Sequence, residues 1–158
     1  MYQLTQNTSV KADLLWKRTF YDENGTNGDV SDLNTWNGSV GLDQELNEFF
    51  AHSLVIGRES SFSGVANTQT VNFARYLPTY QLRENLALKG RLVYEDGKDS
   101  PADNSESYIR RIYGLGLGYN LSEKLSIDAS YDFIKNTSNV ASRNYEQNRV
   151  LLTVIYDF

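Results

Sequence analysis

The chain has 158 residues, with 15 Lys and Arg against 20 Asp and Glu, a net charge of −5, no Cys and a mean hydropathy of −0.51. The lack of Cys excludes a disulfide scaffold and thiolate metal sites, the negative charge gives no support to nucleic-acid binding, and no run reaches the roughly 18 apolar residues of a membrane-spanning helix. The unusual feature is the number of aromatic residues in so polar a chain: 11 Tyr, 7 Phe and 2 Trp.

The first predicted element covers residues 10–20, where apolar and polar residues alternate with the period of a β-strand. The apolar phase, which is interrupted at Arg18, consists of Val10, Ala12, Leu14, Trp16 and Phe20. The opposite phase carries Lys11, Asp13, Lys17 and Thr19. We therefore expect a strand with one apolar and one polar face.

The next predicted strands cover residues 34–44, 49–59 and 67–79 and have weaker alternation. Apolar residues occupy both phases of the last two, as at Val55 and Ile56. The pattern leaves the faces of these two strands open and is compatible with a bulge.

Clear alternation returns over residues 86–95, where Leu88 and Leu92 oppose Lys89 and Arg91. The following strand, 107–119, has three glycines on its polar phase: Gly114, Gly116 and Gly118. Two interpretations have equal weight. The glycines make room for long side chains from other strands, such as Arg91 or Arg149, or they allow the strand to curve.

The last two predicted strands, 125–133 and 150–158, alternate most regularly. Their apolar phases consist of Leu125, Ile127, Ala129, Tyr131 and Phe133, and of Val150, Leu152, Val154, Tyr156 and Phe158. No comparable stretch has a period of 3.6 residues. The sequence therefore predicts an all-β chain of eight strands.

The connections alternate between short and long. The short ones are polar turns at 45–48, 82–85 and 120–124, whereas the long ones, 22–33, 60–66, 96–106 and 134–144, are rich in Gly, Asn, Asp and Ser. This alternation predicts an antiparallel up-and-down meander, with all long loops at one end and both termini at the other.

Such a meander can form a soluble barrel, for example a calycin-like ligand carrier, or a membrane barrel with its apolar face outward. The polar phase mixes opposite charges that could pair inside a narrow lumen, although a solvated face of mixed charge is an alternative. This predicted lumen network consists of Lys11, Asp13, Lys17, Lys89, Arg91, Glu95, Asp128, Asp132 and Arg149.

The positions of the aromatic residues favour the membrane barrel. They gather near strand ends, as at Phe20, Trp36, Tyr80, Tyr94 and Tyr119, where two interfacial belts are expected. A strand of about ten residues also has the length that crosses the hydrocarbon when tilted. We therefore predict an eight-stranded transmembrane β-barrel that forms a single domain over residues 1–158.

The C-terminal run 148–158, with aromatic residues at its last and third-last positions, resembles the terminal strand of Gram-negative outer-membrane β-barrels. The hairpin 113–133 is similar to hairpins of proteobacterial β-barrel porins. The resemblance implies an integral protein of the bacterial outer membrane with periplasmic termini. It also implies that the barrel-assembly machinery recognises Leu152, Val154, Tyr156 and Phe158.

The sequence contains no recognisable catalytic constellation, and we expect no enzyme activity, cofactor or metal. His52 is the only histidine, and its neighbour Ser53 cannot share a face with it in a regular strand. The acidic loops 22–33 and 96–106 could bind divalent cations, but their spacing matches no EF-hand loop. We therefore expect them to be solvated acidic loops. The arginines near the loop end are candidate contacts for lipopolysaccharide phosphates: Arg18, Arg58, Arg110 and Arg111.

The predicted function is structural or surface-binding, through loops 22–33 and 96–106 of a closed barrel whose lumen is filled by side chains. The expected partners are outer-membrane lipids, lipopolysaccharide and the assembly machinery, with no nucleic acid. The alternative is that these strands are the C-terminal part, or the whole, of a porin that passes small solutes. The sequence leaves the ligand, the conductance and the oligomeric state open.

Overall fold

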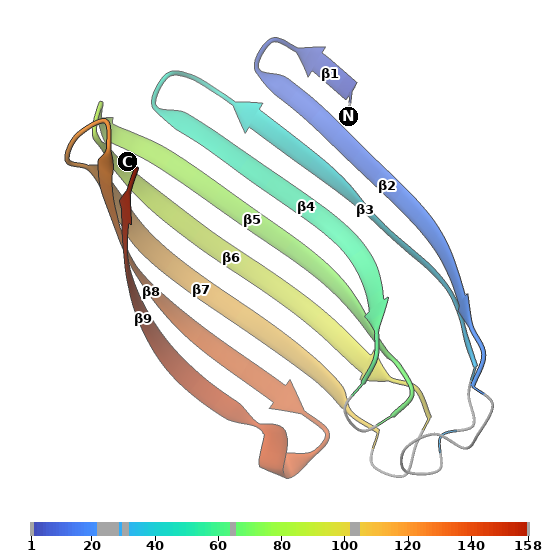
Figure 1. Ribbon diagram of the computed structural model, residues 1–158. Helices are drawn as coiled ribbons and strands as arrows, with labels where there is room; N and C mark the ends of the chain where they lie inside the picture. Colours follow the sequence, from blue (N-terminus) through green and yellow to red (C-terminus); the bar gives the residue numbers. More distant parts are fainter. Residues whose placement is uncertain (1, 22–28, 30–31, 64–65, 102–104, 158) are drawn as a thin grey trace.

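The computed structural model describes residues 2–21, 29, 32–63, 66–101 and 105–157 and is built almost entirely from antiparallel strands (Figure 1). The eight predicted strands correspond to β2 (Thr8–Thr19), β3 (Leu33–Glu45), β4 (Phe50–Ser61), β5 (Gln69–Arg83), β6 (Leu86–Asp99), β7 (Ser107–Asn120), β8 (Leu125–Ser138) and β9 (Tyr145–Tyr156). A short strand, β1 (Tyr2–Thr5), and one 3-10 turn, η2 (Ala141–Arg143), complete the described elements. The predicted all-β fold is confirmed.

None of the described residues belongs to a helix with the length and hydrophobicity needed to span a bilayer.

Each strand pairs with the next one along the chain, so the sheet order is β1 to β9 without a crossover. The short turns lie at one end of the sheet with both termini, and the long connections lie at the other end (Figure 1). The predicted meander is therefore confirmed. It follows that β1 and β9, the two outermost strands, run in the same direction.

The sheet is open, which differs from the expectation that the first long strand pairs with the last. Within the described residues, β9 pairs only with β8, and the edge of β2 at Thr8, Ser9 and Val10 is occupied by β1. Strand alternation specifies which face is apolar, but it contains no signal for how tightly a sheet curls. The curvature and the strand count decide closure, and neither is set by local sequence.

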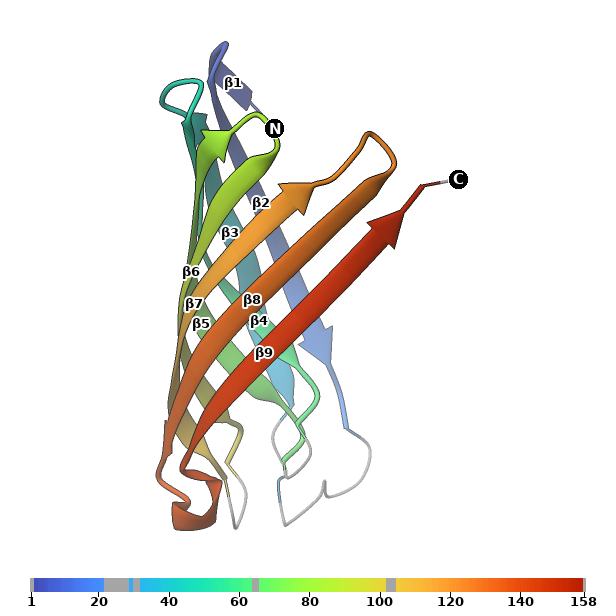
Figure 2. The same cartoon turned by 90° about the vertical axis from the view of Figure 1, so that its left-hand side faces the viewer.

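The strands are strongly tilted across the sheet (Figure 2). A row of directly opposed residues starts at Thr8, the first residue of β2, passes through Pro78 and Leu115, and ends at Val150 in the middle of β9. Such a stagger between neighbouring strands is characteristic of barrel walls.

The register shows which residues of β4 and β5 lie on each face of the sheet, which the sequence left open. Ile56 opposes Val40 and Ala74 on the convex face, whereas Val55 opposes Gly41 and Arg75 on the concave face. The β4–β5 register is continuous, so β4 contains no bulge. β5 has apolar residues in both phases because its concave residues Val71 and Phe73 belong to a buried apolar group at the loop end, together with Leu33, Tyr108 and Ile134.

Several strands extend into segments that we expected to be loops. β6 continues to Asp99 and β8 to Ser138, so the predicted loops 96–106 and 134–144 begin too early. Gly97 is needed here for packing and does not form a turn, because a Cβ atom at this position would lie 2.3 Å from the Tyr108 ring. Most of the predicted loop 22–33 lies outside the described residues.

Candidate functional site: the charged concave wall

A row of four opposed residues crosses the C-terminal half of the sheet on its concave face. Arg91 of β6 opposes Gly114 of β7, Gly114 opposes Asp132 of β8, and Asp132 opposes Arg149 of β9. Sequence alternation predicts the shared face, and the pairing of four successive strands brings the three charged side chains together.

Asp132 is the centre of this arrangement. Arg91 Nη2 donates to both carboxylate oxygens at 2.7 Å, and Arg149 donates to Oδ2 from Nη2 at 2.8 Å and from Nε at 3.2 Å. The Asp132 side chain is only 2% exposed, whereas the Arg91 and Arg149 side chains are 37% and 47% exposed. A buried carboxylate thus lies beneath two guanidinium groups that remain partly hydrated.

Gly114 allows Arg91 to reach across β7. A Cβ atom at residue 114 would lie 2.4 Å from Asp132 Oδ1 and 3.0 Å from Arg91 Cβ. Gly118 has the same role four residues further along β7, where Lys89 pairs with Asp128 and a Cβ atom would lie 2.9 Å from both partners. The contacts favour the interpretation that these glycines make room for long side chains.

The other predicted lumen residues lie on the same face but in separate groups. Glu95 accepts from Arg110 at 3.2 Å and lies 3.8 Å from Arg75, which also contacts Glu59. On the same face near the N-terminal edge of the sheet, Lys11 pairs with Asp43 at 2.7 Å and Asp13 accepts from Ser39 at 2.7 Å. Lys17 lies over the Phe62 ring.

Sequence reasoning missed four charged members of these groups: Asp43, Glu59, Arg75 and Arg110. Arg75 stands between Phe73 and Leu77 on a strand with apolar residues in both phases, which hid its face. Asp43 belongs to a strand of weak alternation. Asp43 lies opposite Ser9, next to Lys11, but β2 and β3 are joined by a long connection, so no short turn fixes their register.

The four arginines predicted to contact lipopolysaccharide do not share a face. Arg18 lies over Phe20 and Arg111 over Tyr94 on the convex face, to which Arg58 also belongs. The expected position of Arg110 is corrected, because its side chain lies on the concave face in the ion pair with Glu95. Adjacent residues of a strand point to opposite faces, so Arg110 and Arg111 cannot act together on a lipid.

The predicted assembly signal lies on the free edge strand. Leu152, Val154 and Tyr156 are exposed on the convex face of β9, each more than half accessible, and Phe158 lies outside the described residues. The other edge of β9 has no strand partner within the described residues. The apolar row thus lies on a strand that has one edge open to pairing within the described residues.

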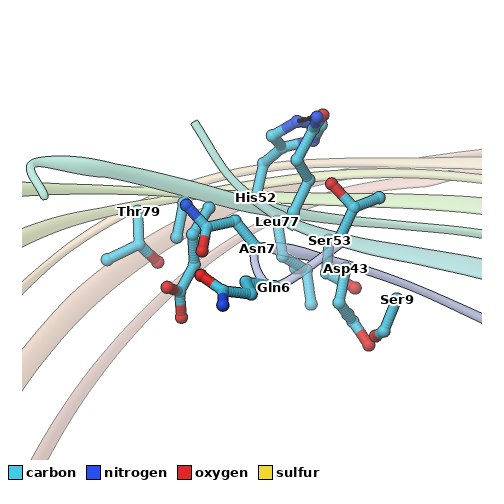
Figure 3. Close-up of a pocket in the computed structure, with 12 residues that line it drawn as sticks. Gln6, Asn7, Ser9, Asp43, His52, Ser53, Leu77 and Thr79 are labelled. Atoms are coloured by element: carbon cyan, nitrogen blue, oxygen red, sulfur yellow. Dashed lines mark hydrogen bonds between the residues drawn. The ribbon is translucent and has the colours of Figure 1, made fainter. Parts of the chain in front are cut away.

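His52 lies on the convex face near the short-turn end, between the rings of Phe50 and Tyr76 at 5.8 and 5.6 Å. Its Nε2 is 3.2 Å from Gln44 Oε1. Figure 3 shows the cavity of about 540 Å³ beside it, with Asp43 and Ser9 on the opposite side of the sheet from the imidazole. The register places Ser53 on that opposite face as well, as predicted.

The long connections are joined to each other at the loop end. Asp29, which is 0% exposed, accepts from Asn67 N at 2.7 Å and from Ser100 Oγ, and thereby links three connections. Arg143 of the fourth connection donates to Glu106 at 2.7 Å. Burial, with the charges of Asp29 and Asp32, raises the pKa of Tyr21 in the same cluster.

This arrangement differs from the solvated acidic loops that we expected, because Asp29 and Asp99 are buried acceptors of hydrogen bonds. Within the part of the chain that the structure describes, no three metal-ligating side chains lie together. The remaining acidic residues of loop 22–33, except Asp32, lie outside the described residues.

Comparison with known proteins agrees with this fold. No curated protein matches the chain. Among solved structures, the chain is similar to Ail, the attachment invasion locus protein of Yersinia pestis, in complex with the heparin analogue sucrose octasulfate, with 19% identity, a TM-score of 0.35 and coverage of 95% of this chain and 97% of that one. The family model "Putative beta-barrel porin 2" matches residues 71–158, which is more than half of the chain. The chain therefore belongs to this porin family and is a β-barrel protein of the bacterial outer membrane.

Proposed function

We propose that this chain forms part of the wall of a barrel wider than eight strands and that its concave face lines a passage for small solutes. The observation that carries the proposal is the open sheet. Within the described residues, β9 pairs only with β8, and β1 covers only Thr8, Ser9 and Val10 of β2, so both edges of the sheet have backbone groups without a strand partner. Every backbone group in hydrocarbon needs a partner, and further strands would satisfy both edges.

The concave face supports a water-filled passage. Lys89, Arg91 and Arg149 are paired with carboxylates yet remain between one third and one half exposed. The joined loops lie at one end of the concave face and would narrow the passage there. In a closed eight-stranded barrel with a structural or surface-binding role, these side chains would instead fill the lumen.

Single-channel recording in planar bilayers tests the proposal on the full-length protein. We expect steady openings of porin size. A folded protein that inserts and stays silent would overturn the proposal in favour of the filled lumen.

The proposed orientation places the long connections outside the cell and both termini in the periplasm. The convex arginines near the loop end, Arg18, Arg58 and Arg111, would then lie at the level of lipopolysaccharide phosphates. Their support is the shared face and level, since guanidinium groups bind phosphate strongly.

We expect Arg111→Gln to weaken binding of the detergent-solubilised protein to immobilised lipopolysaccharide by severalfold. Arg110→Gln is the matched control, because its side chain lies on the other face in the pair with Glu95. Equal binding by both variants would contradict the role of Arg111.

The apolar convex row of β9 is proposed as the recognition signal for the barrel-assembly machinery. The double variant Val154→Ser and Tyr156→Ser should reduce folded protein in the outer membrane severalfold, as measured by immunoblotting of membrane fractions. The control is Thr153→Ser with Ile155→Ser, which alters the concave side of the same strand. A matching loss in both pairs would show that only strand stability was affected.

A further inference from the structure

Arg58, like Lys98 of β6, differs from three other convex cations near the loop end of the sheet. Arg18 lies over Phe20, Arg111 lies over Tyr94, and Lys135 pairs with Glu146 at 2.8 Å. Within the described residues, Arg58 has no carboxylate, ring or hydrogen-bond acceptor. A lipid phosphate is a suitable partner for such a charged group at the edge of the hydrocarbon, because guanidinium groups bind phosphate strongly.

The sheet divides at this residue. The β3–β4 pairing ends at Gly38 and Arg58, although β3 continues to pair with β2 up to Leu33 and β4 with β5 up to Ser61. The facing edges of the two strands above Arg58 therefore have backbone groups without a strand partner. These groups and Arg58 form one polar region at the loop end of the lipid-facing surface.

An apolar groove of about 490 Å³ runs below this polar region. Its convex lining comes from β2, β3 and β4 and includes Leu14, Trp36, Val40 and Ile56, all more than half exposed. The small residues Ala12 and Gly38 form its floor between these larger side chains.

We propose that this groove binds one molecule of the phosphorylated glycolipid of the outer leaflet, with an acyl chain along the apolar lining and a phosphate on Arg58. The charge at the upper end and the apolar lining below it match the two parts of such a lipid. This inference rests on the proposed orientation, with the convex face toward lipid and the loops outside. It does not depend on whether the barrel conducts.

Native mass spectrometry of the full-length protein, extracted from outer membranes in mild detergent, measures the lipid that remains bound. We expect one lipopolysaccharide molecule per chain, with occupancy reduced about tenfold in Arg58→Gln. Ala12→Phe fills the groove without changing the charge and should reduce occupancy to a similar extent. Lys135→Gln is the matched control and should retain the lipid, because its partner is Glu146.

Two results would overturn the inference. Retention of lipopolysaccharide by both Arg58→Gln and Ala12→Phe would place the lipid elsewhere. Equal retention of added phosphatidylglycerol would show that Arg58 binds any phosphate and that the groove does not select the glycolipid. Each variant is compared only as folded protein, identified by its resistance to unfolding in detergent at room temperature.

Discussion

Leu14→Arg is expected to destabilise the protein in lipid vesicles by roughly 2–4 kcal/mol, the cost of an arginine on the lipid face near the bilayer centre. Leu14 is 75% exposed on the convex face of β2 and lies in the middle of the strand. Its side chain would face hydrocarbon. The free energy of unfolding, measured by urea titration of the reconstituted protein, gives the cost directly.

Leu15→Arg provides the matched control, because the same residue type occurs next in the chain. Leu15 is 60% exposed on the concave face, where Lys17 and Asp13 are its neighbours along the strand. We expect a change below about 1 kcal/mol, the usual range for an exposed polar site. Equal costs for both variants, or a larger cost for Leu15→Arg, would show that the convex face does not contact lipid.

Alternation predicted this pair of faces correctly because it is a local property of the chain. Leu14 and Lys11 are three positions apart, an odd number, so any regular strand places them on opposite faces. The same argument placed Arg91, Asp132 and Arg149 on one face before their partners were known. The pattern left the faces of β4 and β5 open because both strands have apolar residues in both phases, and on β5 the concave ones include Phe73 of the buried apolar group.

Contacts between strands could not be predicted in the same way, since they depend on register and on side-chain packing over long sequence separations. Arg91 meets Asp132 across a strand because Gly114 lacks a side chain, and the sequence left that role equal to simple curvature. Likewise, Gly97 near several Asp residues looked like a turn, although it lies in β6 beneath the Tyr108 ring. The open sheet has no local signal either, since both an eight-stranded and a wider barrel need the same alternation.

Asp132→Ala is expected to reduce the free energy of unfolding by roughly 2–3 kcal/mol. Removing one partner of a buried ion pair is costly because the remaining charge loses its counterion. Here two guanidinium groups would be left facing each other. Their partial exposure keeps the cost below the roughly 3–5 kcal/mol of breaking a fully buried ion pair.

Asp128→Ala on the same strand is the control that separates burial from charge. Asp128 also pairs with a β6 cation, Lys89, but both side chains are more than one third exposed. Its loss should cost below about 1 kcal/mol. Urea titration of both variants in vesicles decides between two descriptions of the wall. A large cost confined to Asp132 would mean that the Arg91 and Arg149 positions depend on one buried carboxylate, whereas equal small costs would mean that water, and not Asp132, holds the arginines along the passage.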